Sequence, residues 1–89
     1  MRIKDGFIKR KVAGKDIVVA LGKNTAEFNK MLTLNETASF IFDLLTEDCT
    51  EEDIVRALAD TYEDVDEELI KSDVSAFVAK LRETGVLID

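Results

Sequence analysis

The sequence predicts a small α+β domain of the winged helix-turn-helix kind, with an N-terminal three-stranded antiparallel sheet followed by three helices. The first third of the chain shows the alternation and β-branched content of strands. From residue 35 onward, apolar residues recur at the three- and four-residue spacing of a helix face. A chain of 89 residues closes only one hydrophobic core, so we expect a single domain over residues 1–89.

The first third of the chain has the features of a three-stranded meander. A run rich in β-branched residues follows a turn candidate at residues 13–16, which indicates a hairpin. A later stretch alternates, with Phe28, Leu32 and Leu34 on one side. The expected strands are 7–12, 17–21 and 28–34.

Each of the three expected helices begins at a residue suited to N-capping. These residues are Asn35, Thr50 and Asp66, and an acid three residues after Thr50 suggests a capping box. Gly85 is placed to end the third helix, and residues 86–88 are expected to return as a short strand. The expected buried stripes are Ala38, Ile41, Phe42 and Leu45, then Ile54, Leu58 and Tyr62, then Ile70, Val74, Phe77 and Leu81.

The residue types present argue against catalysis. The chain has one cysteine, Cys49, and no histidine, whereas a nucleophilic thiol needs a base and the common zinc sites need several Cys or His. We expect no catalytic residue, no metal site, no cofactor and a reduced thiol in a cytoplasmic protein. No N-terminal apolar run follows the early charges, so we expect no signal peptide and no membrane partner.

Charge is distributed unevenly along the chain. Residues 1–34 carry a charge of +5 and residues 35–89 a charge of −12, which together make the net charge of −7. A helix that enters the DNA major groove ordinarily carries Lys and Arg, but here the expected second helix has Arg56 among acids. A winged-helix DNA-binding regulator is therefore an alternative that charge disfavours. The acidic run over residues 47–68 is either solvated helix surface or a face that docks on a basic partner.

Residues 31–45, MLTLNETASFIFDLL, resemble the PqqD family, in which a strand ending in Leu-Asn runs into a helix of the pattern Asn-Glu-Thr-x-x-x-Ile-aromatic-x-Leu-Leu. The likeness extends over residues 7–88. It implies a peptide-recognition element of pathways that make ribosomally synthesised, post-translationally modified peptides (RiPPs). Such an element is not an enzyme: it holds the leader segment of a precursor peptide and presents it to a modifying enzyme, often a radical S-adenosylmethionine (SAM) enzyme, in RiPP or PQQ-like biosynthesis.

The resemblance further implies that the leader docks as an added strand on the edge of the third strand, with the third helix as the other wall of a groove. Alternation and helical spacing then suggest which residues line it. Val78 either floors this groove or makes one more core contact, and Lys71 and Arg82 are otherwise ordinary solvated charges. The expected peptide-binding residues are Phe28, Lys30, Met31, Leu32 and Thr33 on the strand, with Lys71, Ser75, Val78 and Arg82 on the helix.

Other interpretations stay open at this point. Basic residues on the strands either favour an acidic leader or discourage edge-to-edge aggregation. The free strand edge allows a monomer or a weak homodimer. Besides the DNA-binding regulator, a small enzyme and an interaction module with an unrelated partner are the alternatives to leader binding.

Overall fold

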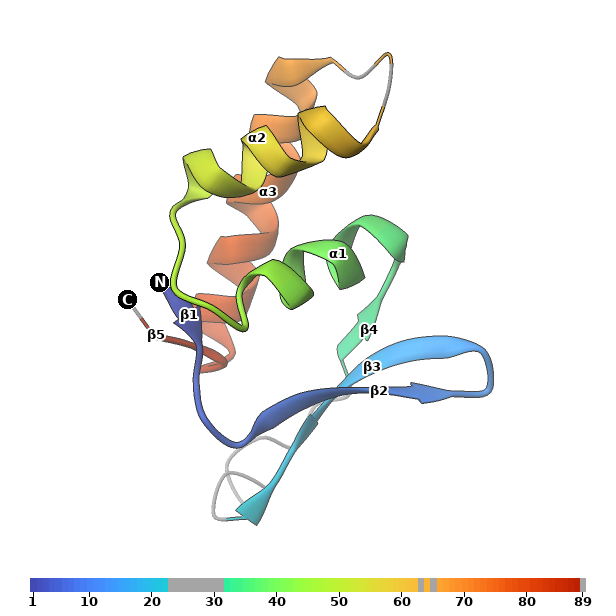
Figure 1. The fold of residues 1–89 in the computed structure, drawn as a ribbon. Helices are drawn as coiled ribbons and strands as arrows, with labels where there is room; N and C mark the ends of the chain where they lie inside the picture. Colours follow the sequence, from blue (N-terminus) through green and yellow to red (C-terminus); the bar gives the residue numbers. More distant parts are fainter. Residues whose placement is uncertain (23–31, 63, 65, 89) are drawn as a thin grey trace.

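The computed structural model describes residues 1–22, 32–62, 64 and 66–88, in which strands precede and follow three helices (Figure 1). This order confirms the predicted α+β class. The strands are β1 (Arg2–Ile3), β2 (Phe7–Val12), β3 (Lys15–Ala20), β4 (Leu32–Leu34) and β5 (Leu87–Ile88), and the helices are α1 (Glu36–Leu44), α2 (Glu51–Thr61) and α3 (Glu67–Glu83).

Strands β2, β3 and β4 form an antiparallel sheet in that order. The hairpin turn is shorter than expected, because Val12 already pairs with Lys15. Ala13 and Gly14 span it with φ of 52° and 79°, as a type I′ turn requires. The second strand consequently begins at Lys15 instead of residue 17. Of the third expected strand, Leu32–Leu34 is confirmed, and residues 28–31 lie outside the described residues.

The first and last strands pair in a second, smaller sheet. Only the last of these strands was predicted. β1 pairs with β5 in antiparallel fashion, and the termini lie side by side (Figure 1). The backbone N–H of Ile3 also donates to the carbonyl of Leu45 at 2.7 Å. The N-terminal segment therefore links the end of α1 to the strand that follows α3.

All three predicted N-caps are confirmed. The side chain of Asn35 accepts a hydrogen bond from the N–H of Ala38 at 2.8 Å, and Asp66 accepts one from Glu68 at 3.0 Å. Thr50 and Asp53 form the reciprocal bonds of a capping box, at 3.0 and 3.1 Å.

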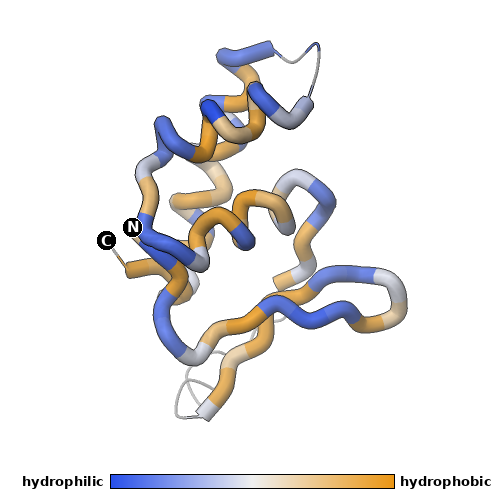
Figure 2. Tube along the Cα trace, viewed as in Figure 1, coloured by the Kyte–Doolittle hydropathy of each residue, from blue (hydrophilic) through white to orange (hydrophobic). Residues whose placement is uncertain are grey.

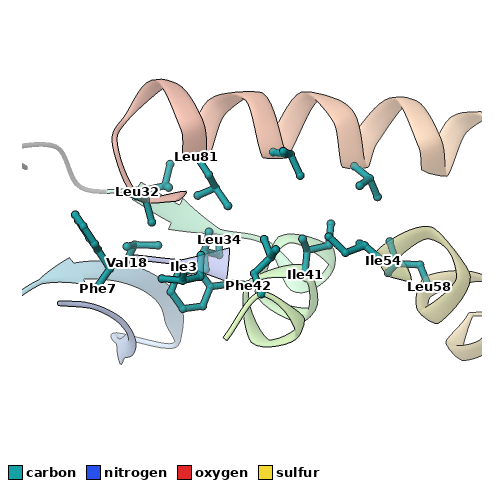
Figure 3. Packing of buried hydrophobic residues seen from close by; sticks show 14 of the residues in the cluster. Ile3, Phe7, Val18, Leu32, Leu34, Ile41, Phe42, Ile54, Leu58 and Leu81 are labelled. Atoms are coloured by element: carbon teal, nitrogen blue, oxygen red, sulfur yellow. The ribbon is translucent and has the colours of Figure 1, made fainter. Parts of the chain in front are cut away.

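Helix α3 packs over the sheet, α1 and α2 in turn, and the buried side chains form one row beneath it (Figure 3). Its buried residues are Val74, Val78 and Leu81. The predicted stripe was wrong in part, since Ile70 and Phe77 are only half-buried and Val78 takes a core position. None of the helices in the described part of the chain is long and apolar enough to cross a membrane.

A polar network fixes α1 to the hairpin. The ammonium of Lys9 donates to Ser39 Oγ at 2.7 Å and to Asp43 Oδ2 at 2.8 Å. Ser39 Oγ in turn donates to Asp16 Oδ2 at 2.8 Å. Figure 2 shows that β2 is hydrophilic along much of its length, whereas β3 is largely hydrophobic. The network thus holds α1 against β2 and β3 through polar side chains.

We expect Ala13→Asn to stabilise the domain. An L-residue other than Asn or Asp is strained at positive φ, and Asn-Gly is a preferred pair for a type I′ turn. The free energy of unfolding should rise by about 0.5–1 kcal/mol, measured by urea denaturation. An unchanged or lower value would contradict the turn geometry.

The capping box should make stability depend on pH. Hydrogen bonds from the backbone and side chain of Thr50, helped by Arg56, lower the pKa of Asp53. A carboxyl group whose pKa is lower in the folded state than in the unfolded state, where it is about 3.9, stabilises the fold at pH values above the unfolded pKa. This stabilisation is lost as the pH falls through the folded pKa. Asp53→Asn should therefore be less stable than the wild type at neutral pH, with a difference that shrinks in this acidic window. Denaturation at several pH values would measure it, and a difference independent of pH would contradict the assignment.

Candidate peptide-binding groove

Strand β4 presents an open backbone edge. On one side it pairs with β3, in the register Leu32 to Val18, Thr33 to Ile17 and Leu34 to Asp16. On its other side, no strand within the described residues pairs with it. In an antiparallel sheet, alternate residues direct their N–H and C=O groups away from the paired neighbour, so this edge offers hydrogen-bonding groups to an incoming strand.

The side chains of β4 divide between core and surface. Leu32 and Leu34 are buried, whereas Thr33 is exposed on the opposite face. Leu32 lies below α3, in the same row as Leu34 and Leu81 (Figure 3). Of the strand residues predicted to bind peptide, Leu32 therefore acts as a core residue and Thr33 stays accessible. Phe28, Lys30 and Met31 lie outside the described residues.

A hollow lies where β4 ends, between the start of α1 and α3. We call it the strand-end hollow. Its volume is about 340 Å³, enough for a side chain to enter. Phe77 and Ala38, both half-buried, contribute apolar surface, and Asp73 and Lys80 place opposite charges along α3. The lining residues are Asn35, Thr37, Ala38, Ile41, Asp73, Ala76, Phe77 and Lys80.

The structure does not bring the four predicted α3 residues to this hollow. Val78 is 1% exposed, which fits its alternative role as a core contact. Lys71, Ser75 and Arg82 are exposed. Lys71 lies in a depression on the α2 side, with Glu51 among its neighbours.

The predicted residues miss the hollow because they lie on the other side of the buried stripe of α3. Successive residues turn by about 100°, so the buried stripe of α3 has two flanks. The predicted residues Lys71, Ser75 and Arg82 occupy one flank. Asp73 and Lys80 occupy the other, which borders the strand-end hollow. In the sequence, Phe77 is an aromatic residue at the margin of the predicted core stripe. It could have indicated that this second flank borders a hollow.

The described residues show no sign of an activated nucleophile. Burial raises the pKa of the Cys49 thiol, and the nearby Asp53 acts in the same direction. Both effects disfavour the reactive thiolate. Among the described residues, no group of three or more His, Cys, Asp or Glu is arranged to hold a metal ion. The described residues offer instead an open strand edge beside an apolar hollow.

Two solved structures share this fold over nearly their whole length. The first, "TbiB1 in Complex with the TbiA(beta) Leader Peptide", is 23% identical with a TM-score of 0.74, and the match covers 100% of both chains. The second, "Lasso peptide synthetase B1 complexed with the leader peptide", is 22% identical with a TM-score of 0.74, and the match covers 99% of this chain and 96% of the other. Among curated proteins, no sequence matches significantly.

A protein-family comparison agrees with the resemblance noted in the sequence. The family model described as "Coenzyme PQQ synthesis protein D (PqqD)" matches residues 15–87. The matched segment includes β3, β4, all three helices and the first residue of β5. It therefore contains the open edge and the strand-end hollow. With most of its length matched, the chain belongs to the PqqD family.

Proposed function

We propose that this chain is a RiPP recognition element, which binds the leader segment of a precursor peptide as a strand added to β4 and presents it to a modifying enzyme. The observation that carries the proposal is the open edge of β4 beside the apolar strand-end hollow. Both matched structures are described as complexes with leader peptides, which supports the same function for this fold.

In this proposal, the open edge of β4 and the strand-end hollow contribute differently to binding. Backbone hydrogen bonds along β4 give affinity with little dependence on the peptide sequence. The strand-end hollow gives selectivity, because an apolar side chain of the leader is removed from water against Phe77 and Ala38. Asp73 and Lys80 then favour peptides whose charges match their order along α3.

The proposal makes the chain a peptide chaperone in the cytoplasm and not a catalyst. The resemblance that led to the family points to a radical SAM enzyme as the partner that modifies the bound precursor. The protonated thiol of Cys49 agrees with a role without covalent chemistry. The acidic first turn of α2, with Glu51, Glu52 and Asp53, disfavours binding to DNA phosphates.

Filling the strand-end hollow should weaken leader binding. Ala76 lines the hollow, and Ala76→Gln extends a neutral side chain into it while keeping a good helix former. We expect the dissociation constant for the leader of a short precursor encoded beside this chain to rise about tenfold, or ~1.4 kcal/mol. Fluorescence anisotropy with the labelled leader measures it.

Two matched variants control this experiment. Ala79 and Ser75 are exposed on α3 but do not line the hollow, so Ala79→Gln and Ser75→Gln should bind the leader like the wild type. Circular dichroism should show equal folding for all three variants. A loss of affinity in Ser75→Gln with none in Ala76→Gln would place the peptide on the opposite flank of α3.

A further inference from the structure

A second and larger hollow lies where the end of α2 meets the start of α3. We call it the corner hollow, and its volume is about 490 Å³. It lies outside the segment of β4 that can pair with a peptide backbone, so strand addition alone does not account for it. Its lining residues are Thr37, Leu58, Tyr62, Asp64, Asp66, Leu69, Ile70 and Asp73.

The inner surface of the corner hollow is apolar. Leu69 is 60% exposed, an unusual position for a large aliphatic side chain in a domain that buries most of its leucines. Ile70 and Tyr62 are half-buried beside it. The ring of Tyr62 packs edge-on against Phe40, with centroids 6.0 Å apart, which holds this wall in place. The hollow therefore suits an aliphatic or aromatic side chain.

The rim of the corner hollow is negatively charged. Asp64, Asp66 and Asp73 all line it, and none of its lining residues is Lys or Arg. The ion pairs found among the described residues include none of these three carboxylates. Asp66 also accepts the capping hydrogen bond of α3. A ligand that carries a cation next to its apolar group would complement this rim.

The corner hollow continues the strand-end hollow. Thr37 and Asp73 line both. The two hollows extend along α3 from Leu69 to Lys80, which is about 16 Å of helix. An extended peptide covers this length with about five residues. A peptide that leaves the edge of β4 at Leu34 therefore has a continuous path to the corner.

We propose that the corner hollow binds an apolar residue of the leader that stands next to a Lys or Arg, about five residues beyond the segment paired with β4. This inference rests on the proposed function and adds a second anchor to it. The charges that line the two hollows then set the direction of the leader: an acidic residue near Lys80 and a basic residue near Asp73 and Asp64.

The test uses the labelled synthetic leader and two variants of the whole chain. The double variant Asp64→Asn with Asp66→Asn removes two rim charges that line the corner hollow and not the strand-end hollow. Asn tolerates the positive φ of residue 64 and caps a helix as well as Asp does. Leu69→Ala removes apolar surface at an exposed site. Each should raise the dissociation constant about fivefold, and the loss from the charge variant should shrink at high salt.

A matched control and a changed peptide complete the design. Glu68→Gln removes one charge from α3 at an exposed position outside the hollow and should leave affinity unchanged. Replacing the leader's basic residue with Gln should weaken binding to the wild type about fivefold. The same replacement should have little effect on binding to the charge variant, because the interaction has already been removed.

The outcomes separate this inference from the proposed function. Unchanged binding by the charge variant and by Leu69→Ala, together with weakened binding by Ala76→Gln, would reject the corner hollow and leave the proposed function standing. No binding of the leader to the wild-type chain would overturn both.

Discussion

Helix α3 packs against the sheet, α1 and α2, and this packing forms the core that holds these elements together. Val74, Val78 and Leu81 are each at most 1% exposed. The row that they form meets the sheet at one end and α2 at the other, with α1 between them (Figure 3). In so small a chain, no second core replaces this contact. Loss of any of the three side chains would loosen the sheet and the helices together.

The same contact positions the strand-end hollow, which we propose as a docking site for the leader. Burying Val78 turns Asp73, Ala76 and Lys80 toward the start of α1, where the strand-end hollow forms. The network from Lys9 through Ser39 holds α1 against the hairpin, so the hollow stays aligned with the end of β4. In the proposed function, backbone pairing and side-chain selection would therefore take place at adjacent positions.

Local signals in the sequence predicted most of the fold. N-caps and the hairpin depend on neighbouring residues, so Asn35, Thr50 and Asp66 could be identified without tertiary information. β1 has two residues, too few to show the alternating pattern of a strand. Only its pairing with β5 makes it a strand. The family resemblance suggested a groove beside α3, and the two hollows border the flank of α3 that carries Asp73. Which side of α3 faces α2 depends on packing between distant segments, so the roles of Val78 and Phe77 could not be assigned from spacing alone.

We propose that β4 accepts a peptide strand on its open edge. Amide hydrogen exchange, followed by NMR for residues 32–34 with and without the leader, tests this most directly. A β-ladder protects alternate amides, so we predict that the amides of β4 that point away from β3 exchange more slowly once the leader is bound. Saturating leader with unchanged exchange throughout β4, and shift changes confined to α2 or the hairpin turn, would contradict the account.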